Sequence, residues 1–201
     1  LCAQAQGTIV HRQLSTPNPD PNFPWDFQGL RLLSGFDPIY YDMDLNGDGR
    51  AEYRFDSSIS GFHFTGTDNN RIAAFQSLNT FFTLPLDSMS PVGPDVSPFS
   101  WASGVTVVTS CRDIGCIGLF TGVESAYAGL QFQLEGQTHY GWVRLGAPLA
   151  GLNGGWIYEY AYETRPDTPI LTGAVPEPST WALLGAAGLL FWWYGRRKKT
   201  G

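Results

Sequence analysis

Charged residues are scarce in this sequence of 201 residues, and lysine is almost absent. Charged side chains make up 15% of the chain, against about 25% in an average soluble protein. The two lysines, Lys198 and Lys199, follow Arg196 and Arg197, so residues 1–195 hold 8 arginines against 18 acids and carry a net charge of −10. No basic stripe with interleaved aromatics is present. An acidic surface repels phosphates, so we expect no nucleic-acid partner.

The patterns of common catalytic sites are also missing. There is no G-x-S-x-G and no H-E-x-x-H sequence. The three histidines, His11, His63 and His139, have apolar or aromatic neighbours in strand-like patterns, as is usual for residues of a sheet. Glu159 and Glu163 are a carboxylate pair, but nothing in the sequence places them across a cleft as a glycosidase needs. We therefore expect no catalytic residues and no enzyme, with an unrecognised secreted hydrolase as the alternative.

Cysteine is rare as well, since Cys2, Cys111 and Cys116 are the only three. The last two form a C-x4-C pair without the second Cys/His pair that a zinc site usually needs. In an exported domain such a pair favours a disulfide that closes a small loop. We predict a disulfide between Cys111 and Cys116, with a metal site as the alternative.

The sequence is rich in turn-forming and aromatic residues, with 24 glycines, 14 prolines and 14% Phe, Trp and Tyr. Helical periodicity is scarce, whereas alternation of apolar and polar residues is common, which indicates short strands separated by turns. The expected strands lie at residues 7–15, 38–45, 51–59, 61–67, 80–86, 104–111 and 154–164, and the best hairpin lies at 127–145. We predict an all-β fold, an antiparallel β-sandwich of jelly-roll-like type, over residues 6–168.

The segment 42–53, D-M-D-L-N-G-D-G-R-A-E-Y, contains the start of an EF-hand-like calcium loop. Three oxygen-bearing side chains follow one another at a spacing of two, and Gly49 allows the sharp turn that comes next. A backbone carbonyl and one further carboxylate complete the set that we predict for calcium: Asp44, Asn46, Asp48, Arg50 (through its carbonyl) and Glu52.

This calcium pattern is incomplete, because the twelfth position holds Phe55 where a bidentate Glu is expected. Asp42 or Asp56 would have to supply that ligand. The alternative is a hairpin turn with solvated acids, since N-G and D-G are typical turn sequences between strands. Calcium is the one cofactor that the sequence indicates, and a weak site would suffice at the millimolar calcium found outside cells.

The aromatic residues have two interpretations. On a sandwich they can form a face that stacks on sugar rings, or they can fill an ordinary core. The residues concerned are Trp25, Trp101, Trp142, Trp156, Tyr127, Tyr140, Tyr158, Tyr160 and Tyr162. The last three alternate along one expected strand and would share one face.

The longest apolar run lies just before the cations of the C-terminal segment. Residues 181–194 carry no charge, and as a helix they span about 21 Å. This is shorter than a hydrocarbon core of about 30 Å, so a buried or interfacial helix is the alternative. Aromatic residues beside the four adjacent cations favour a transmembrane helix at 179–195 with a basic cytoplasmic tail at 196–201. A linker is expected at 169–178.

The first residues indicate a signal for export, which a body held outside the cytoplasm by a C-terminal helix needs. Ala3, Gln4 and Ala5 form the A-x-A pattern that precedes a signal-peptidase site. We interpret residues 1–5 as the remnant of a signal peptide. The positive-inside rule then places the body outside the cytoplasm.

The order of features at residues 175–199 resembles the PEP-CTERM sorting signal of Gram-negative bacteria. Its triplet corresponds to Pro176, Glu177 and Pro178, preceded by Val175; the apolar run follows, and the cations Arg196, Arg197, Lys198 and Lys199 come last. The resemblance implies recognition by an exosortase, an integral-membrane cysteine protease or transpeptidase. It also implies transient anchoring in the inner membrane and a link to extracellular polysaccharide.

These patterns lead to one expected function and two alternatives. We expect an exported protein of the cell surface or extracellular matrix, processed by an exosortase, whose body has a structural or adhesive role. The alternatives are a carbohydrate-binding module that uses exposed aromatics and the unrecognised hydrolase.

Overall fold

The computed structural model describes residues 7–16, 29–33, 37–95, 99–112, 115–147 and 154–176. All regular secondary structure in these ranges is β-strand, so the predicted all-β class is confirmed. The strands are β1 (Ile9–Gln13), β2 (Leu30–Leu33), β3 (Ile39–Met43), β4 (Tyr53–Ser58), β5 (Gly61–Gly66), β6 (Arg71–Ser77), β7 (Thr80–Thr83), β8 (Pro91–Val92), β9 (Ser100–Ser103), β10 (Val105–Arg112), β11 (Gly115–Ile117), β12 (Ala126–Leu134), β13 (Gln137–Gly146), β14 (Gly154–Glu163) and β15 (Ile170–Leu171).

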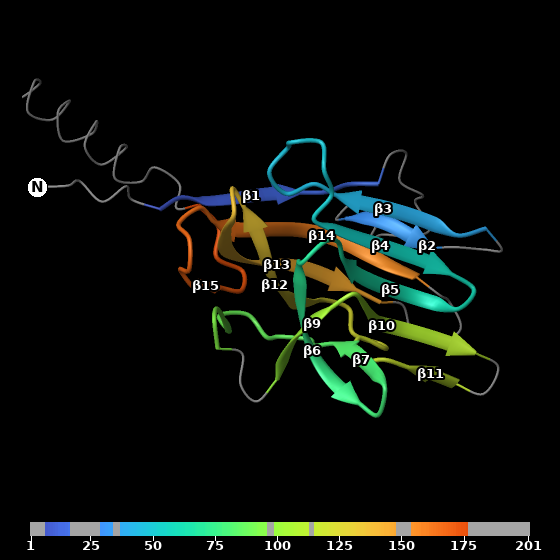
Figure 1. The fold of residues 1–201 in the computed structure, drawn as a ribbon. Coiled ribbons are helices and arrows are strands. Elements are labelled where there is room, and N and C mark those ends of the chain that lie inside the picture. Colours follow the sequence, from blue (N-terminus) through green and yellow to red (C-terminus); the bar gives the residue numbers. More distant parts are fainter. Residues whose placement is uncertain are drawn as a thin grey trace, which may run out of the picture.

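Thirteen of these strands form one sheet, whose main path runs β1-β14-β13-β12-β6-β7-β10-β5-β4-β3. Every pairing in it is antiparallel except the one between β10 and β7. The sheet curls, because β14 also contacts β4 and β5 although they lie far along the path (Figure 1). The strands of this sheet are thus continuous through hydrogen bonds.

The curled sheet encloses a core built mainly from aromatic rings. Phe55 of β4 stacks on Phe64 of β5 with ring centroids 4.0 Å apart, and both side chains are fully buried. Tyr53 is buried too, and its hydroxyl shares its one proton between the carbonyls of Arg71 (3.1 Å) and Gln131 (2.9 Å). Through Tyr53, strand β4 is therefore linked to β6 and β12, which lie further along the path of the curled sheet.

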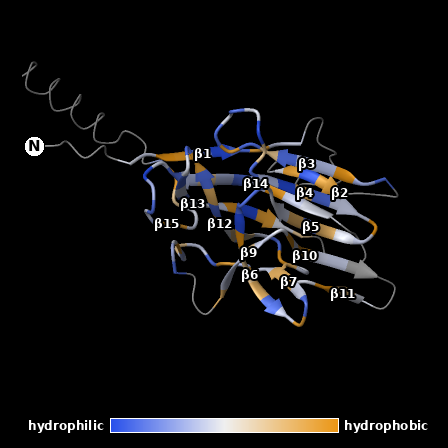
Figure 2. Ribbon diagram, in the orientation of Figure 1, coloured by the Kyte–Doolittle hydropathy of each residue, from blue (hydrophilic) through white to orange (hydrophobic). Residues whose placement is uncertain are grey.

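The hairpin of β12 and β13 was predicted at 127–145 and is confirmed, with Leu134 opposite Gln137. Its two turn residues, Glu135 (φ 52°) and Gly136 (φ 76°), both have positive φ, as the tightest hairpin turns require. Hydrophobic and hydrophilic residues are interspersed along the strands of the sheet (Figure 2). On β13, however, both faces are buried, including Tyr140 and Trp142 on the face turned away from the main core.

That outer face of β13 is covered by the C-terminal part of the body. Tyr140 and Trp142 form a second cluster with Val92 of β8 and Ile170 of β15. Strands β8 and β15 pair with each other in a small two-stranded sheet. Residues 169–174 were predicted to lie in a linker (169–178), but they pack on the body because their apolar residues find partners there.

Several predictions concern residues that the structure does not describe. The signal-peptide remnant (1–5), the transmembrane helix (179–195) and the basic tail (196–201) lie outside the described residues. Within the described ranges, no helix has the length and apolar character that crossing a membrane requires.

Both ends of the described chain leave the body on the same side. Thr8, just before β1, exchanges hydrogen bonds with Thr164, just after β14. In Figure 1 the start of β1 and strand β15 lie at one end of the molecule, and the hairpin of β10 and β11 lies at the opposite end.

Candidate functional site

The segment before the Pro-Glu-Pro triplet, residues 169–174, is held against the body and is called the C-terminal clamp below. Ile170 lies opposite Val92 and Leu171 lies opposite Pro91 in the pairing of β15 with β8. Ile170 is 4% exposed, whereas Leu171 points outward and is 40% exposed. At the start of the clamp, Pro169 lies so close to Gly93 that a Cβ on this glycine would be 2.9 Å from the proline ring.

Thr172 is the most firmly held residue of the clamp. Its side chain is fully buried. Its hydroxyl donates to the carbonyl of Asp87 (2.6 Å) and accepts from the N–H of Ser90 (2.8 Å). Its own N–H donates to the carbonyl of Ser90 (2.9 Å), and its carbonyl accepts from the N–H of Met89 (3.0 Å). Four hydrogen bonds thus tie one residue to the turn between β7 and β8.

The exposure of the chain increases toward the end of the clamp and beyond it. The last two clamp residues, Gly173 and Ala174, are half-buried, and the N–H of Ala174 donates to the carbonyl of Leu171 (3.0 Å). Val175 and Pro176 are exposed. The other predicted recognition residues, Glu177, Pro178, Arg196, Arg197, Lys198 and Lys199, lie outside the described residues.

At another part of the body, the connection from β3 to β4 forms a loop rich in acids, residues 44–52, called the acidic loop below. Asp44 organises it, because its two carboxylate oxygens accept the N–H of Gly47 (2.6 Å) and of Gly49 (2.8 Å). Both glycines have positive φ, 78° and 87°, which glycine adopts without steric penalty.

Asp48 and Asn46 hold the tip of the acidic loop. The N–H of Asp48 donates to the Asn46 side-chain oxygen (2.9 Å), and the Asn46 amide donates back to the Asp48 carboxylate (3.2 Å). The other oxygen of Asp48 accepts the N–H of Arg50 (2.8 Å). Side chains at i, i+2 and i+4 therefore face one another, as in a calcium loop and equally as in a tight turn.

Glu52 completes the group from the buried side. It is 6% exposed, and its Oε2 accepts the N–H of Leu45 (2.7 Å). Burial raises the pKa of Glu52, and the charges of Asp44 and Asp48 raise it further, while two backbone hydrogen bonds oppose the shift. One carboxylate oxygen from each of Asp44, Asp48 and Glu52 lies within 4.8 Å of the others. A divalent cation bound between them would relieve this repulsion.

The structure brings three of the five predicted calcium ligands together and places Asn46 and Arg50 beside them. The two substitutes for the twelfth ligand lie away from this group. Asp42 forms a two-pronged ion pair with Arg54 (2.6 and 2.9 Å), and Asp56 lies 3.9 Å from His63. These two residues lie on strands β3 and β4 and do not join the acid cluster. Calcium binding stays a prediction.

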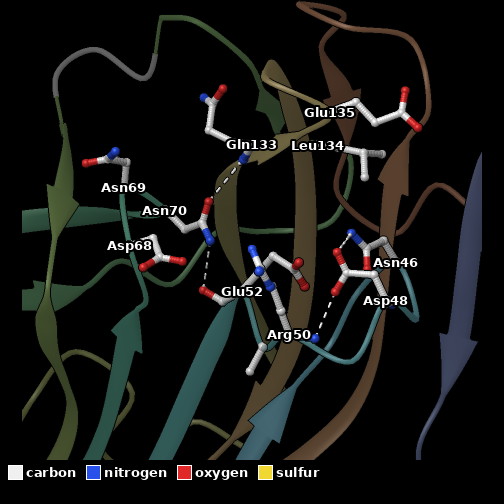
Figure 3. A pocket seen from close by; sticks show the side chains of 11 residues that line it. Asn46, Asp48, Arg50, Glu52, Asp68, Asn69, Asn70, Gln133, Leu134 and Glu135 are labelled. Carbon is white, nitrogen blue, oxygen red and sulfur yellow. Dashed lines mark hydrogen bonds between the residues drawn. The ribbon is translucent and has the colours of Figure 1, made fainter.

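A cavity of about 550 Å³ opens beside the acidic loop (Figure 3). It is lined by Asn46, Asp48, Arg50, Ala51, Glu52, Asp68, Asn69, Asn70, Gln133, Leu134 and Glu135. Asn70 is buried and connects its walls: its amide donates to the Glu52 carbonyl (3.2 Å), and its oxygen accepts the N–H of Gln133 (3.0 Å). The residues beyond position 52 were not predicted. The D-N-N sequence at 68–70 signals a turn, but not that this turn meets the acidic loop.

Two of the three histidines hold strands together. His11 Nε2 lies 2.9 Å from Glu159, whose other oxygen accepts a hydrogen bond from Arg144 (2.7 Å). Burial raises the pKa of Glu159, but the hydrogen bond of His11 and the charge of Arg144 outweigh it, so that the pKa lies below its usual value. His139 contacts the Glu163 carbonyl at 3.0 Å. These contacts link β1, β14 and β13.

Of the two interpretations of the aromatic residues, the ordinary core fits most of them. The tyrosines of β14 are buried, with 2% exposure for Tyr158, 2% for Tyr160 and 6% for Tyr162. Tyr140, Trp142 and Trp156 are buried as well. Trp101 and Tyr127 are half-buried against the cluster under the clamp, and Trp25 lies outside the described residues. The reason is that β13 and β14 are covered on both faces.

The two cysteines of the predicted disulfide lie in neighbouring strands. Cys111 of β10 is directly opposite Cys116 of β11 in the register of the hairpin, and Cys116 is disulfide-bonded. The pairing with Cys111 stays a prediction. A thiol assay on the denatured mature chain checks it, since two reactive thiols would contradict the bridge.

The clamp leads into a segment that is a protein-sorting signal by its sequence. Residues 174–198 match the family described as the PEP-CTERM protein-sorting motif. No curated protein and no solved structure matches the chain. The chain therefore carries the PEP-CTERM motif that the residue order at 175–199 predicted, and this recognition is confirmed. The motif implies export, transient membrane anchoring and processing by an exosortase.

Proposed function

We propose that this protein is a structural or adhesive component of the cell surface or of the extracellular polysaccharide matrix. The observation that carries the proposal is the PEP-CTERM motif at residues 174–198, directly after the last packed residues of a folded body. In this proposal Val175 to Pro178 are the recognition sequence, and Arg196, Arg197, Lys198 and Lys199 hold the cytoplasmic end of the signal during processing.

Mass spectrometry of surface material tests this proposal. The mature chain from wild-type cells should lack the terminal cations and end between Val175 and the start of the apolar run. Cells without the exosortase should retain the intact precursor. An identical C-terminus in both strains would contradict exosortase processing, and a mature chain confined to the periplasm would contradict the role at the surface.

We also propose that the body is not an enzyme. In its support, His11 and His139 are engaged in contacts between strands. Incubation of the purified chain with polysaccharides of the producing cell should leave their length unchanged. Shortened polysaccharide would favour the hydrolase, and binding on a glycan array that disappears on Trp101→Ala would favour a carbohydrate-binding module.

A jelly-roll-like sandwich is our proposal for how the body closes on its core. It is supported by the contacts of β14 with β4 and β5 across the curl. An experimental structure in which these strands do not face each other would contradict it.

Calcium binding by the acidic loop is a second proposal. It is supported by the three converging carboxylates and by the burial of Glu52 beside Asp44 and Asp48, which raises the pKa of Glu52. The ligands are Asp44, Asn46, Asp48, the Arg50 carbonyl and Glu52. Millimolar calcium should raise the melting temperature of the wild-type chain.

The matched variants for this test are Glu52→Gln and Glu135→Gln. Both glutamates line the same cavity, but only Glu52 belongs to the proposed ligands. The calcium-dependent rise should be lost in Glu52→Gln and kept in Glu135→Gln. An equal melting temperature with calcium and with a chelator would contradict calcium binding and would favour the alternative, a hairpin turn with solvated acids.

A further inference from the structure

We propose that the C-terminal clamp, residues 169–174, must open before the exosortase can process the sorting motif. Docking of β15 on β8 would then control the rate of processing. This inference rests on the proposed exosortase processing and adds a regulatory step to it.

The first argument is the short distance that the closed clamp allows. Four residues, 175–178, separate Ala174 from the predicted start of the membrane segment at residue 179. Fully extended, they span about 13–14 Å. A membrane enzyme would have to reach this stretch while a folded body lies within that distance of the bilayer.

The second argument is the need of a protease for extended substrate. Peptides commonly bind as an added strand, with main-chain hydrogen bonds along several residues. Val175 is exposed and can bind in this way through its N–H and carbonyl, and the exposed Pro176 can contribute its carbonyl. Thr172 cannot, because its N–H, carbonyl and hydroxyl are all engaged by Asp87, Met89 and Ser90.

Opening of the clamp removes both restrictions at once. Release of residues 169–174 adds about 20–22 Å of extended chain. It also frees the backbone groups of Thr172 for the enzyme. The rest of the body need not unfold, since β15 and β8 pair through only two residues each, and short peripheral elements open most readily.

The test compares processing rates in cells that contain the exosortase, by pulse labelling and the ratio of mature chain to precursor. The first variant inserts eight Gly/Ser residues between Ala174 and Val175, which supplies length without opening the clamp. The second is Thr172→Val, which keeps the shape and removes two buried hydrogen bonds. Its control is Thr168→Val, because the Thr168 hydroxyl donates to the nearby Pro166 carbonyl (3.1 Å), outside the clamp.

A third variant locks the clamp shut by the double substitution Pro91→Cys and Leu171→Cys. These residues are direct partners in the antiparallel pair, and such partners lie about 4.5–5.5 Å apart, within the range of a disulfide. Two controls are needed. One is the single substitution Leu171→Cys. The other is the wild type with reductant, because reductant would also open the disulfide of Cys116.

We expect the inserted spacer and Thr172→Val each to speed processing. The effect of Thr172→Val should be roughly thirtyfold, because its two lost hydrogen bonds each favour the closed clamp by a factor of about five. Thr172→Val should add nothing once the spacer is present. The locked chain should stay unprocessed until reductant is added. If processing requires the exosortase but is indifferent to the spacer or to the lock, the inference is wrong. If processing is unchanged without the exosortase, the proposed function itself fails.

Discussion

The acidic loop and the C-terminal clamp are both short segments fixed by hydrogen bonds, but their partners come from different distances along the chain. Within the described residues, the carboxylates of the acidic loop accept from donors inside the loop, such as Gly49 to Asp44 and Leu45 to Glu52. Thr172 of the clamp is bound instead to Asp87, which precedes it by 85 residues. The carboxylate contacts of the loop therefore depend on its own sequence, although its carbonyls at Glu52 and Asp44 also accept from Asn70 (3.2 Å) and Tyr160 (3.3 Å). The clamp, by contrast, can close only on a folded body.

The largest test of this comparison is Trp142→Ala. Trp142 is fully buried in the cluster under the clamp, and its ring meets that of Tyr127 edge-on at 5.1 Å. Its truncation should lower the free energy of unfolding by about 3–5 kcal/mol. Hydrogen exchange should become much faster at the N–H of Thr172 and change little at the N–H of Leu45. Equal acceleration at both sites would show that the two regions are not distinct.

A smaller effect is expected from Asp44→Ala in the acidic loop. The substitution removes the acceptor for Gly47 and Gly49, and should lower the stability by about 1 kcal/mol in calcium-free buffer. Denaturant unfolding measures the loss. Asp44→Asn is the matched control, because it keeps one side-chain oxygen and should recover part of the stability. A loss above that of Trp142→Ala would contradict the view that the contacts of the Asp44 carboxylate are local to the loop.

The smallest expected effect concerns how the free energy of unfolding depends on pH, to which two glutamates contribute in opposite directions. The pKa of Glu52 in the folded protein is raised above the ordinary 4.5. Folded Glu52 therefore keeps its proton at a pH where the unfolded chain has lost it. Its contribution to the free energy of unfolding is lost as pH rises through the window above 4.5. The pKa of Glu159 is lowered, so its contribution is present above pH 4.5 and is lost as pH falls through the folded pKa.

Unfolding curves from pH 3 to 7, roughly the span in which carboxylates titrate, separate these two contributions. Glu52→Gln should remove the fall in stability with rising pH, and Glu159→Gln should remove the loss on acidification. The prediction is wrong if both substitutions change the profile in the same direction.

The contrast between loop and clamp also explains how much of the fold the sequence could predict. The hairpin of β12 and β13 was found because its alternation and its turn are local. Strand β6 was missed, since Ile72, Ala73 and Ala74 are all buried and show no alternation. Strands β8 and β15 were missed because two residues carry no periodic signal, and their pairing depends on the outer face of β13.

The same reasoning applies to the candidate sites. The cluster of Asp44, Asp48 and Glu52 follows from spacing within nine residues, so the sequence could indicate it. The cavity wall around Asn70 could not be foreseen, because it comes from turns that only the curled sheet brings together. The sequence left open whether the aromatic residues form a sugar-stacking face or a core, because nothing in β14 itself shows that both its sides are covered.

The two ends of the described chain lie together, opposite the hairpin of β10 and β11 (Figure 1). An attachment at residue 176 would therefore leave β10 and β11 at the end of the body that lies away from it. Ile117 (59% exposed) and Leu119 (40% exposed) are part of this region, so an anchored body would turn these apolar side chains away from its anchor.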